Sequence, residues 1–427
     1  MTANGTTRGR ARGTRRLHGN PRGGRAITFL VLLMVLSLIG SACGGGDDAD
    51  PDDGDTATTT AGGGGTEAPG GTEPAGEGLS PEIQAAVDEA AALGLQFATS
   101  HDEIVEKAQQ EDGRLVVQTS TAEFQAFKDA FEADYPFIEL EWVELSGAAT
   151  ERMLIEVESG QASRYDVGYP APEAYNVISD LMAWDLYGMS QLGILDIPLA
   201  SVDEENRVVV AAGSSGVALA YNADLIAEAD LPQTWDEVAD ARFSRDELGM
   251  SMDIDLNNVS VLATSPDWGI ERVVELMTAM AAQDPIYVDG HVNAALLVQS
   301  GEVGISPFIN LHSAIRERDK DPEGPLQVHL IEPVPVRASE AYGVFGDALA
   351  TAPYSALLFV EWIANNDDAQ ELLDADPLQA SLYWEGSNMA EMIGDLGVAV
   401  ADPAGVAALP DWIEQIQAAA GFPQLTE

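Results

Sequence analysis

Cysteine is almost absent from this chain, which has one, Cys43, in 427 residues. A lone cysteine forms no intrachain disulfide and completes no CxxC metal motif. The five histidines are isolated from one another, and none falls in an HExxH or other His-carboxylate spacing typical of zinc. A G-x-S-x-G elbow, a GxxxxGK[ST] loop and a GxGxxG fingerprint are missing as well. We therefore expect no enzyme, no catalytic metal and no cofactor.

Positive charge is also scarce. The sequence has 20 Lys and Arg against 71 Asp and Glu. Seven of the basic residues fall within residues 1–25, so the chain that follows carries 13 bases against 71 acids, a formal charge of −58. Nucleic-acid binding needs a basic surface, and this composition argues against it. We interpret the excess of acid as a solvated surface that keeps the protein soluble.

The first 42 residues have the pattern of a secretion signal. Arg-rich residues 1–25 precede the almost wholly apolar residues 26–39, and small residues follow. About 14 apolar residues span only ~21 Å as a helix, short of the ~30 Å membrane core, so a permanent transmembrane helix is the weaker interpretation. We expect residues 1–42 to be a signal peptide and the protein to be exported, by a Sec or a twin-arginine route.

Cys43 directly follows this leader, and the stretch GSAC at residues 40–43 resembles a bacterial lipoprotein signal. The resemblance implies that Cys43 is lipidated and anchors the protein to the extracellular face of the cell membrane. Gly40 stands where the pattern prefers Leu, so an ordinary secretion signal stays the alternative. Residues 44–78 contain no large apolar side chain, and we expect 43–79 to be a flexible tether.

Hydrophobic periodicity divides the rest of the chain into alternating strands and helices. A capping box, Ser100 with Glu103, predicts a helix over 101–111, and Thr234 with Glu237 forms a second box. The expected strands cover 115–117, 138–145, 165–168, 208–220, 249–254, 303–309 and 328–336. The other expected helices cover 149–158 and 352–373, and an amphipathic one carries Phe124, Phe127 and Phe131 on one face.

Strands separated by helices predict an α/β fold with a mainly parallel sheet, in which ligands bind at the carboxyl ends of strands. The polar turn at 118–121 lies at such an end, directly before the amphipathic helix. Ser120 and Thr121 can present hydroxyls there beside the free N–H groups of the helix N-terminus. Capping of that helix by Thr119 or Ser120 is the other interpretation, and the two roles are compatible. The length from Leu79 onward suits two lobes better than one core.

Six segments occur in an order that is typical of one protein family. They are EKAQQEDGRLVVQTSTAEFQAFKDAFEADYPFIELEWVE, SRYDVGYP, GVALAYNADL, LPQTWDEVAD, QSGEVGIS and ALLFVEWIANNDDAQELL. In order and spacing, this set resembles the extracellular solute-binding proteins of bacterial ABC importers, particularly the group that takes ferric ion, polyamines or phosphonates.

The resemblance implies a periplasmic-binding-protein-like type II fold, with two α/β lobes joined by hinge strands and closing over a small molecule. The chain would cross near 210–218 and return near 332–345. Lobe 1 would then hold 80–212 and 341–427, and lobe 2 would hold 213–340. The resemblance also implies a monomer that performs no chemistry and delivers its solute to the permease subunits of an ABC importer.

Ferric-binding members of the group use a tandem tyrosine just after the strand that here reads GEVGISPFINLHSAI. This chain has Asn310, Leu311, His312 and Ser313 at that place. Phenolate is a hard anionic ligand that suits ferric ion, and an amide with one imidazole is a poor substitute. We therefore favour a phosphonate, a phosphate ester, a polyamine or another small organic solute, with free ferric ion as the alternative. His312 is either a donor to this solute or a surface residue.

The other candidate ligand-binding residues follow predicted strands or lie at the crossover. The full candidate set is Ser120, Thr121, Ser146, Gly147, Tyr169, Ser214, Ser215, Asn257, Asn258, Asn310 and His312. No residue is assigned to catalysis or to a metal. A secreted hydrolase with an unrecognised serine or carboxylate pair is one rival function, and a surface adhesion protein is the other.

Overall fold

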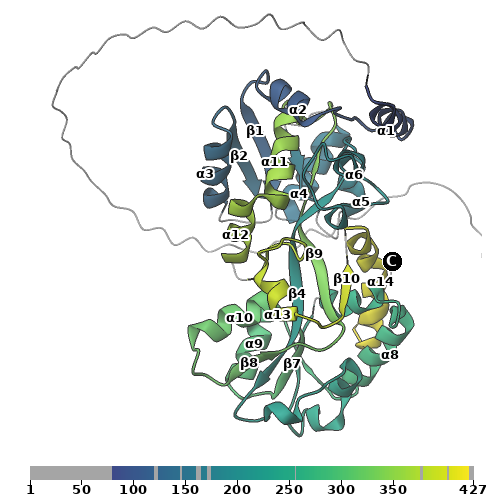
Figure 1. Ribbon diagram of the computed structural model, residues 1–427. Coiled ribbons are helices and arrows are strands. Elements are labelled where there is room, and N and C mark those ends of the chain that lie inside the picture. Colours follow the sequence, from purple (N-terminus) through teal and green to yellow (C-terminus); the bar gives the residue numbers. More distant parts are fainter. Residues whose placement is uncertain are drawn as a thin grey trace, which may run out of the picture. The chain divides into compact units, whose positions relative to one another are not determined.

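The computed structural model of the chain describes residues 79–119, 124–144, 147–159, 165–170, 175–254, 256–375, 378–401 and 403–422 (Figure 1). Within these ranges the strands form one large sheet and a small two-stranded sheet. The strands are β1 Arg114–Thr119, β2 Glu139–Glu144, β3 Val167–Gly168, β4 Val210–Asn222, β5 Ser251–Asp253, β6 Ile286–Val288, β7 Ile305–Asn310, β8 Leu326–His329, β9 Val334–Val344 and β10 Val398–Ala401.

The helices lie between and after these strands. None of the described helices is long and apolar enough to cross a membrane. The α-helices are α1 Pro81–Ala92, α2 His101–Ala108, α3 Gln125–Asp134, α4 Gly147–Glu158, α5 Tyr175–Ser179, α6 Leu186–Gln191, α7 Asn257–Ser260, α8 Gly269–Ala281, α9 His291–Gln299, α10 Leu311–Lys320, α11 Pro353–Asn365, α12 Asp367–Ala375, α13 Asn388–Ile393 and α14 Pro403–Ala419.

The main sheet is mixed, with strand order β2-β1-β3-β9-β4-β7. Strand β1 pairs in parallel with β2 and β3, as expected where helices connect successive strands. Strand β9 runs antiparallel to both β3 and β4, while β10 pairs in parallel with β9. The predicted α/β class is confirmed, although the sheet is less uniformly parallel than the pattern of segments suggested.

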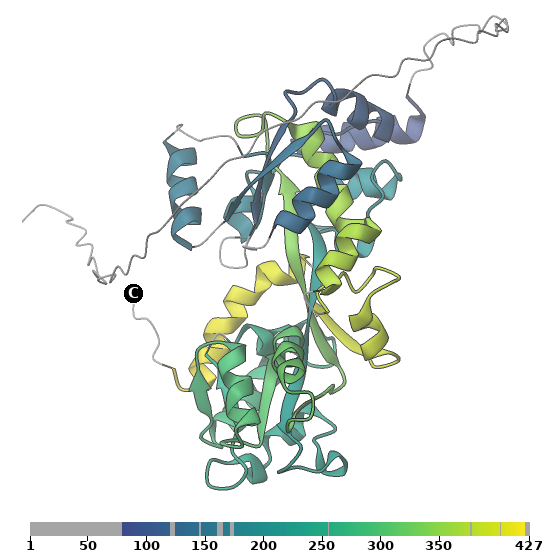
Figure 2. The ribbon, with the colours of Figure 1, turned by 90° about the vertical axis from the view of Figure 1, so that its left-hand side faces the viewer.

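Two long strands, β4 and β9, connect the two ends of this sheet. Their antiparallel ladder extends from Val210 opposite Tyr342 to Gly216 opposite Val336. Beyond this ladder, β4 continues and pairs with β7 and β8. Figures 1 and 2 show both strands passing from the elements around β1 to those around β7. They form at the places where the chain was expected to cross and to return.

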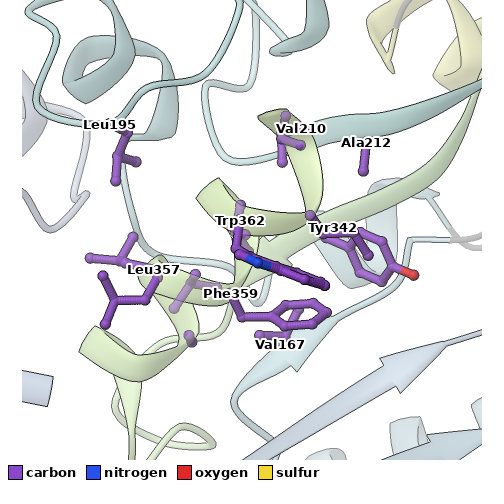
Figure 3. Close-up of a cluster of buried hydrophobic side chains, with 14 of the residues drawn as sticks. Val167, Leu195, Val210, Ala212, Tyr342, Leu357, Phe359 and Trp362 are labelled. Atoms are coloured by element: carbon purple, nitrogen blue, oxygen red, sulfur yellow. The ribbon is translucent and has the colours of Figure 1, made fainter. Parts of the chain in front are cut away.

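One hydrophobic core gathers around α11, beside β1, β3 and β9. Phe359 is fully buried, and its ring lies 5.4 Å from the ring of Phe131 in an edge-to-face contact. Trp362 and Tyr342 also face Phe359 in this cluster (Figure 3). Burial of such large apolar rings removes water from well over 100 Å² each, which makes α11 a central element of this half.

A second core lies around β7, α8 and the short 3-10 helix η4 (Trp235–Ala239). Trp235 is fully buried and stacks on Phe308 with ring centroids 4.2 Å apart. The C-terminal helix α14 contributes Ile416 to this cluster. The chain therefore contributes to the second core again after α11 and α12, which belong to the first. The lobe boundaries, 80–212 with 341–427 and 213–340, stay a prediction.

Three local expectations need correction. Thr234 does not cap an α-helix: its side chain accepts no hydrogen bond, and η4 is a 3-10 helix. The carboxylate of Glu237 accepts from the backbone N–H of Gln233, at 2.8 Å, and not from that of Thr234, so no capping box forms.

The expected strand 328–336 is two strands, since β8 and β9 pair with different parts of β4. The expected helix 352–373 is divided into α11 and α12. Asn366 separates them and accepts from the N–H of Asp368 at 2.9 Å, which starts a new helix.

Two leucines, one buried and one exposed, provide a test of the assignment of α11 to the first core. Leu357 is fully buried in α11, whereas Leu225 is 46% exposed after β4. We expect Leu357→Ala to lower the free energy of unfolding by about 2–5 kcal/mol, because it removes buried apolar surface and leaves a cavity. Leu225→Ala should change it by less than about 0.5 kcal/mol. Urea denaturation of both variants checks this, and equal effects would contradict the assignment of α11 to the core.

Candidate functional site

A cavity of about 230 Å³ lies along the ladder of β4 and β9. Its lining comes from both ends of the sheet and from the ladder between them. The lining residues are Tyr169, Pro170, Tyr175, Ser215, Asn310, His312, Arg337, Ala338, Ser339, Glu340, Ala341, Gln379 and Val406.

The first half of the sheet contributes two tyrosines to this cavity. Tyr169 follows β3, and its ring makes an edge-to-face contact with the buried ring of Tyr342, at 5.9 Å between centroids. Tyr175 begins α5, and its hydroxyl donates to the carboxylate of Asp203 at 2.7 Å. Asp203 is itself buried, so this bond fixes the Tyr175 ring at the cavity wall.

The second half contributes Asn310, the last residue of β7, and His312, in the first turn of α10. The amide of Asn258 holds Asn310 from behind. Its Nδ2 donates to Asn310 Oδ1 at 2.8 Å and to the backbone oxygen of Phe308 at 2.9 Å. Because the Asn310 oxygen is engaged in this way, its N–H groups are the side of the amide that a ligand can use.

Asn258 is supported in turn by an imidazole and a carboxylate. Its Nδ2 lies 3.3 Å from Nε2 of His291, and Nδ1 of His291 lies 3.3 Å from Asp253 Oδ2. Asn258 is 2% exposed, so its Nδ2 depends on these partners, whereas its Oδ1 is buried without a hydrogen-bond partner in the described part of the chain. The arrangement fixes Asn310 through residues that do not line the cavity.

The ladder itself places polar side chains in the middle of the cavity. Ser215 of β4 stands opposite Arg337 of β9, and Ser339 is two residues further along β9 on the same face. The Oγ atoms of both serines and Nε of Arg337 are buried and have no hydrogen-bond partner in the described part of the chain.

Glu340 connects the cavity to the end of β1. Its carboxylate accepts from the hydroxyl of Tyr342 at 2.7 Å, and that hydroxyl lies 3.5 Å from Oγ1 of Thr119. Complete burial raises the pKa of Tyr342 well above its ordinary value, and the neighbouring Glu340 charge acts in the same direction. Tyr342 therefore stays a neutral phenol, whose hydroxyl donates a hydrogen bond to Glu340.

Three non-glycine residues at or behind the cavity have positive φ: 56° at Leu256, 55° at Phe308 and 47° at Glu340. Leu256 precedes α7, which carries Asn258. Phe308 precedes Asn310, and Glu340 lines the cavity itself. Left-handed backbone is costly for such side chains and tends to occur at functional sites.

Close approach requires glycine at 213 and favours it at 216, the two glycines of the motif GSSG at residues 213–216. A Cβ on Gly213 would lie 2.7 Å from the backbone oxygen of Gln379, and a Cβ on Gly216 would lie 2.8 Å from the sulfur of Met389. The segments after α12 therefore pack directly on β4. Gln379 reaches the cavity because of this packing.

The structure brings Tyr169, Ser215, Asn310 and His312 from the sequence-based candidate set to one cavity. Ser214 faces another way: its Oγ accepts from the N–H of Leu382 at 2.9 Å. The remaining candidates fall elsewhere. Asn258 stands behind Asn310, Asn257 begins α7, Gly147 begins α4, and Ser120, Thr121, Ser146 and Cys43 lie outside the described residues.

Five polar residues that line the cavity were not predicted from the sequence: Tyr175, Arg337, Ser339, Glu340 and Gln379. Three of them, Arg337, Ser339 and Glu340, lie inside β9, whereas the predicted residues lie after strands or at the crossover. A signal was present, because Arg337 is a single cation within the strand VPVRASEAYGV. A charged residue in the interior of an otherwise mostly apolar strand is unusual and merits attention for that reason.

The described residues contain no group of three or more His, Cys, Asp or Glu side chains that could hold a metal ion. No protein-family model and no curated protein matches the chain.

Solved structures match the fold of this chain at low sequence identity. The apo ferric ion-binding protein A of Pasteurella haemolytica is 14% identical, with a TM-score of 0.57 over 74% of this chain and 100% of that one. A Trichodesmium protein in complex with iron and citrate is 15% identical, with a TM-score of 0.53 over 73% of this chain and 100% of that one.

The substrate-binding protein of an ABC transporter from Agrobacterium tumefaciens is 16% identical, with a TM-score of 0.52 over 72% of this chain and 95% of that one. These likenesses confirm the predicted periplasmic-binding-protein type II fold over most of the chain.

Asn258 provides a test of the support behind the cavity. Asn258→Ala would leave Asn310 Oδ1 and the Phe308 oxygen without their donor, so we expect the free energy of unfolding to fall by about 1–3 kcal/mol. Asn293 is exposed, and its amide donates only to the nearby Asp289 oxygen, four residues earlier. Asn293→Ala should cost less than about 0.5 kcal/mol. Chemical denaturation compares the two, and a cost no larger at Asn258 would refute its supporting role.

Proposed function

We propose that this protein is the solute-binding component of an ABC importer, which captures a small molecule and delivers it to membrane permease subunits. The observation that carries the proposal is the cavity on the β4–β9 ladder. Tyr169 and Tyr175 line it from one half of the sheet, and Asn310 and His312 line it from the other. A ligand held there contacts both halves, which is how receptors of this fold couple binding to hinge closure.

The chemistry of the cavity favours binding over turnover. Tyr175 is engaged with Asp203, and the Glu340 carboxylate accepts from a phenol whose pKa is raised. Both groups are thus held by neighbouring residues of the protein. The similar solved structures named above are described as binding proteins, in agreement with a receptor that performs no chemistry.

We favour a small organic solute, such as a phosphonate, a phosphate ester or a polyamine, over free ferric ion. The residues that replace the tandem tyrosine of the ferric-binding members, Asn310 and His312, face the cavity. They are an amide and an imidazole, which suit hydrogen bonding better than ferric coordination. Ferric ion stays the second candidate, because two of the similar structures are described as ferric ion-binding or iron-bound.

A thermal-shift screen tests the receptor function. Protein freed of carried-over ligand would be heated with phosphonates, sugar phosphates, polyamines, thiamine and ferric citrate. We expect one class to raise the unfolding midpoint with the logarithm of its concentration, because it binds only the native state. The ligand should be recovered unchanged. A chemically altered ligand would favour a hydrolase, and failure of every class would count against a solute receptor.

We also propose that the protein is exported and held on the extracellular face of the cell membrane by lipid on Cys43. The support is the signal-like pattern of residues 1–42 and the tether-like composition of 43–79. A tethered receptor stays close to the permease it serves. We expect it to act as a monomer.

Cys43→Ser tests the anchor. In a bacterial host, we expect the unaltered protein to partition into detergent with the membranes and the variant to appear in the aqueous fraction, because stable anchoring depends on the acyl chains. Mass spectrometry of the mature N-terminus should find the lipid on Cys43. Equal partitioning of the two proteins would exclude lipidation as the means of attachment.

A further inference from the structure

We infer that Arg337 is the centre of an oxyanion-binding site, which accepts a carboxylate, phosphate or phosphonate group of the solute. The inference rests on the proposed receptor function and specifies the chemical class of its ligand. It is carried by the Arg337 side chain, by its place in the β4–β9 ladder and by the two serines beside it.

Arg337 is unlike the other bases of the described chain. Each of the other described lysines and arginines donates a hydrogen bond, forms an ion pair or has another polar interaction. No hydrogen bond or ion pair of the Arg337 side chain is found within the described residues, and its Nε is buried without a partner. In a chain with 71 acids, this isolation is a marked exception.

The position of Arg337 makes the isolation costly. It stands in one row with Ser215 of β4 and Ala401 of β10, so strands flank it on both sides. Arg337 is half-buried and its Nε is buried without a partner, so an acceptor beside it would offset the hydration that this part of the guanidinium has lost. Since Arg337 lines the cavity, an oxyanion held there would supply such an acceptor.

Two hydroxyl groups complete the donor set. Ser215 is 1% exposed, and its Oγ, like that of Ser339, is buried without a hydrogen-bond partner in the described chain. Arg337, Ser215 and Ser339 share one face of the ladder, and each has a donor group without an acceptor in the described chain. A ligand group that only accepts hydrogen bonds would suit all three. An oxyanion is such a group, and guanidinium binds it through parallel hydrogen bonds.

The charges at the cavity also discriminate between ligand classes. The Glu340 carboxylate is already bonded to Tyr342, whereas the Arg337 cation has no such partner among the described residues. A polyamine would bring ammonium groups toward this guanidinium, and like charges repel. The site therefore favours an anionic solute over a polyamine.

Calorimetric titration of the full chain with single probes tests the site. The anionic probes are methylphosphonate, inorganic phosphate and succinate, which separate phosphoryl from carboxylate ligands. Spermidine is the cationic probe, and ferric citrate covers an iron complex. At equal ionic strength we expect at least one anion to bind. Arg337→Gln should weaken it at least about tenfold, since a hydrogen-bonded charge is lost.

The control variants separate this site from general charge effects. Arg245 is 43% exposed and pairs with Asp284, so Arg245→Gln should leave the affinity within about twofold. Arg337→Lys, which keeps the charge but loses the planar fork, should fall between the unaltered protein and Arg337→Gln. Ser215→Ala should weaken the same anion by a smaller factor and gives a second readout if Arg337→Gln fails to fold.

The possible outcomes separate a failure of the oxyanion site from a failure of the receptor function. Binding of spermidine or ferric citrate alone, unaffected by Arg337→Gln, would overturn the oxyanion site and leave the receptor function standing. Equal affinity of an anion for the unaltered protein and for the Arg337→Gln variant would also overturn it. Failure of all five probes, together with failure of the wider thermal-shift screen, would count against both proposals.

Discussion

The antiparallel ladder between β4 and β9 connects the two hydrophobic cores. Val210 to Gly216 of β4 lie opposite Tyr342 to Val336 of β9, and β4 then continues into the second half of the sheet, where it pairs with β7 and β8. Pairing of this kind gives the backbone N–H and C=O groups of the two crossing strands hydrogen-bond partners inside the protein. The cavity lies on this ladder, so the same backbone bonds that join the two halves also position the side chains that a solute would meet.

Support for the cavity comes from successive layers of partners. Asn310 is held by Asn258, which approaches His291 and through it Asp253. On the other side, Glu340 is bonded to Tyr342, whose ring packs in the core around Phe359. Polar groups at the cavity are therefore fixed by residues that belong to the two hydrophobic cores or pack beside them. Such support reduces the freedom that a binding site would otherwise lose when it meets its ligand.

Much of the fold was predictable, because its signals are local. Ser100 caps α2 as its spacing with Glu103 indicated, with its Oγ 3.1 Å from the Glu103 backbone nitrogen. Thr234 with Glu237 has the same spacing but no cap forms, since spacing cannot reveal which N–H the carboxylate will meet. The type II fold followed from the order of segments. The division between β8 and β9 depends on distant pairing with β4 and could not be read from residues 328–336.

The site was predictable only in part. Tyr169 was found because it follows a strand, where ligands of α/β proteins gather. Asn310 was found through the resemblance to the solute-binding proteins, whose ferric-binding members have a tandem tyrosine at that place. Arg337 lies in the middle of β9, and it reaches the cavity only because that strand runs antiparallel across the junction. Gln379 arrives from a later segment that packs on Gly213. Contacts of this kind arise from tertiary packing, which a single sequence does not display.

The left-handed backbone at Leu256, Phe308 and Glu340 has a consequence for the evolution and engineering of the protein. Each such residue carries about 1–3 kcal/mol of conformational energy, and glycine would release much of it. Leu256 and Phe308 are buried in the second core, however, and Glu340 accepts a hydrogen bond from the buried Tyr342 hydroxyl, so glycine at any of the three positions would lose packing or a hydrogen bond of comparable energy. The strained backbone is therefore kept because the side chains that it carries are needed, and selection for heat resistance alone would leave these three positions unchanged.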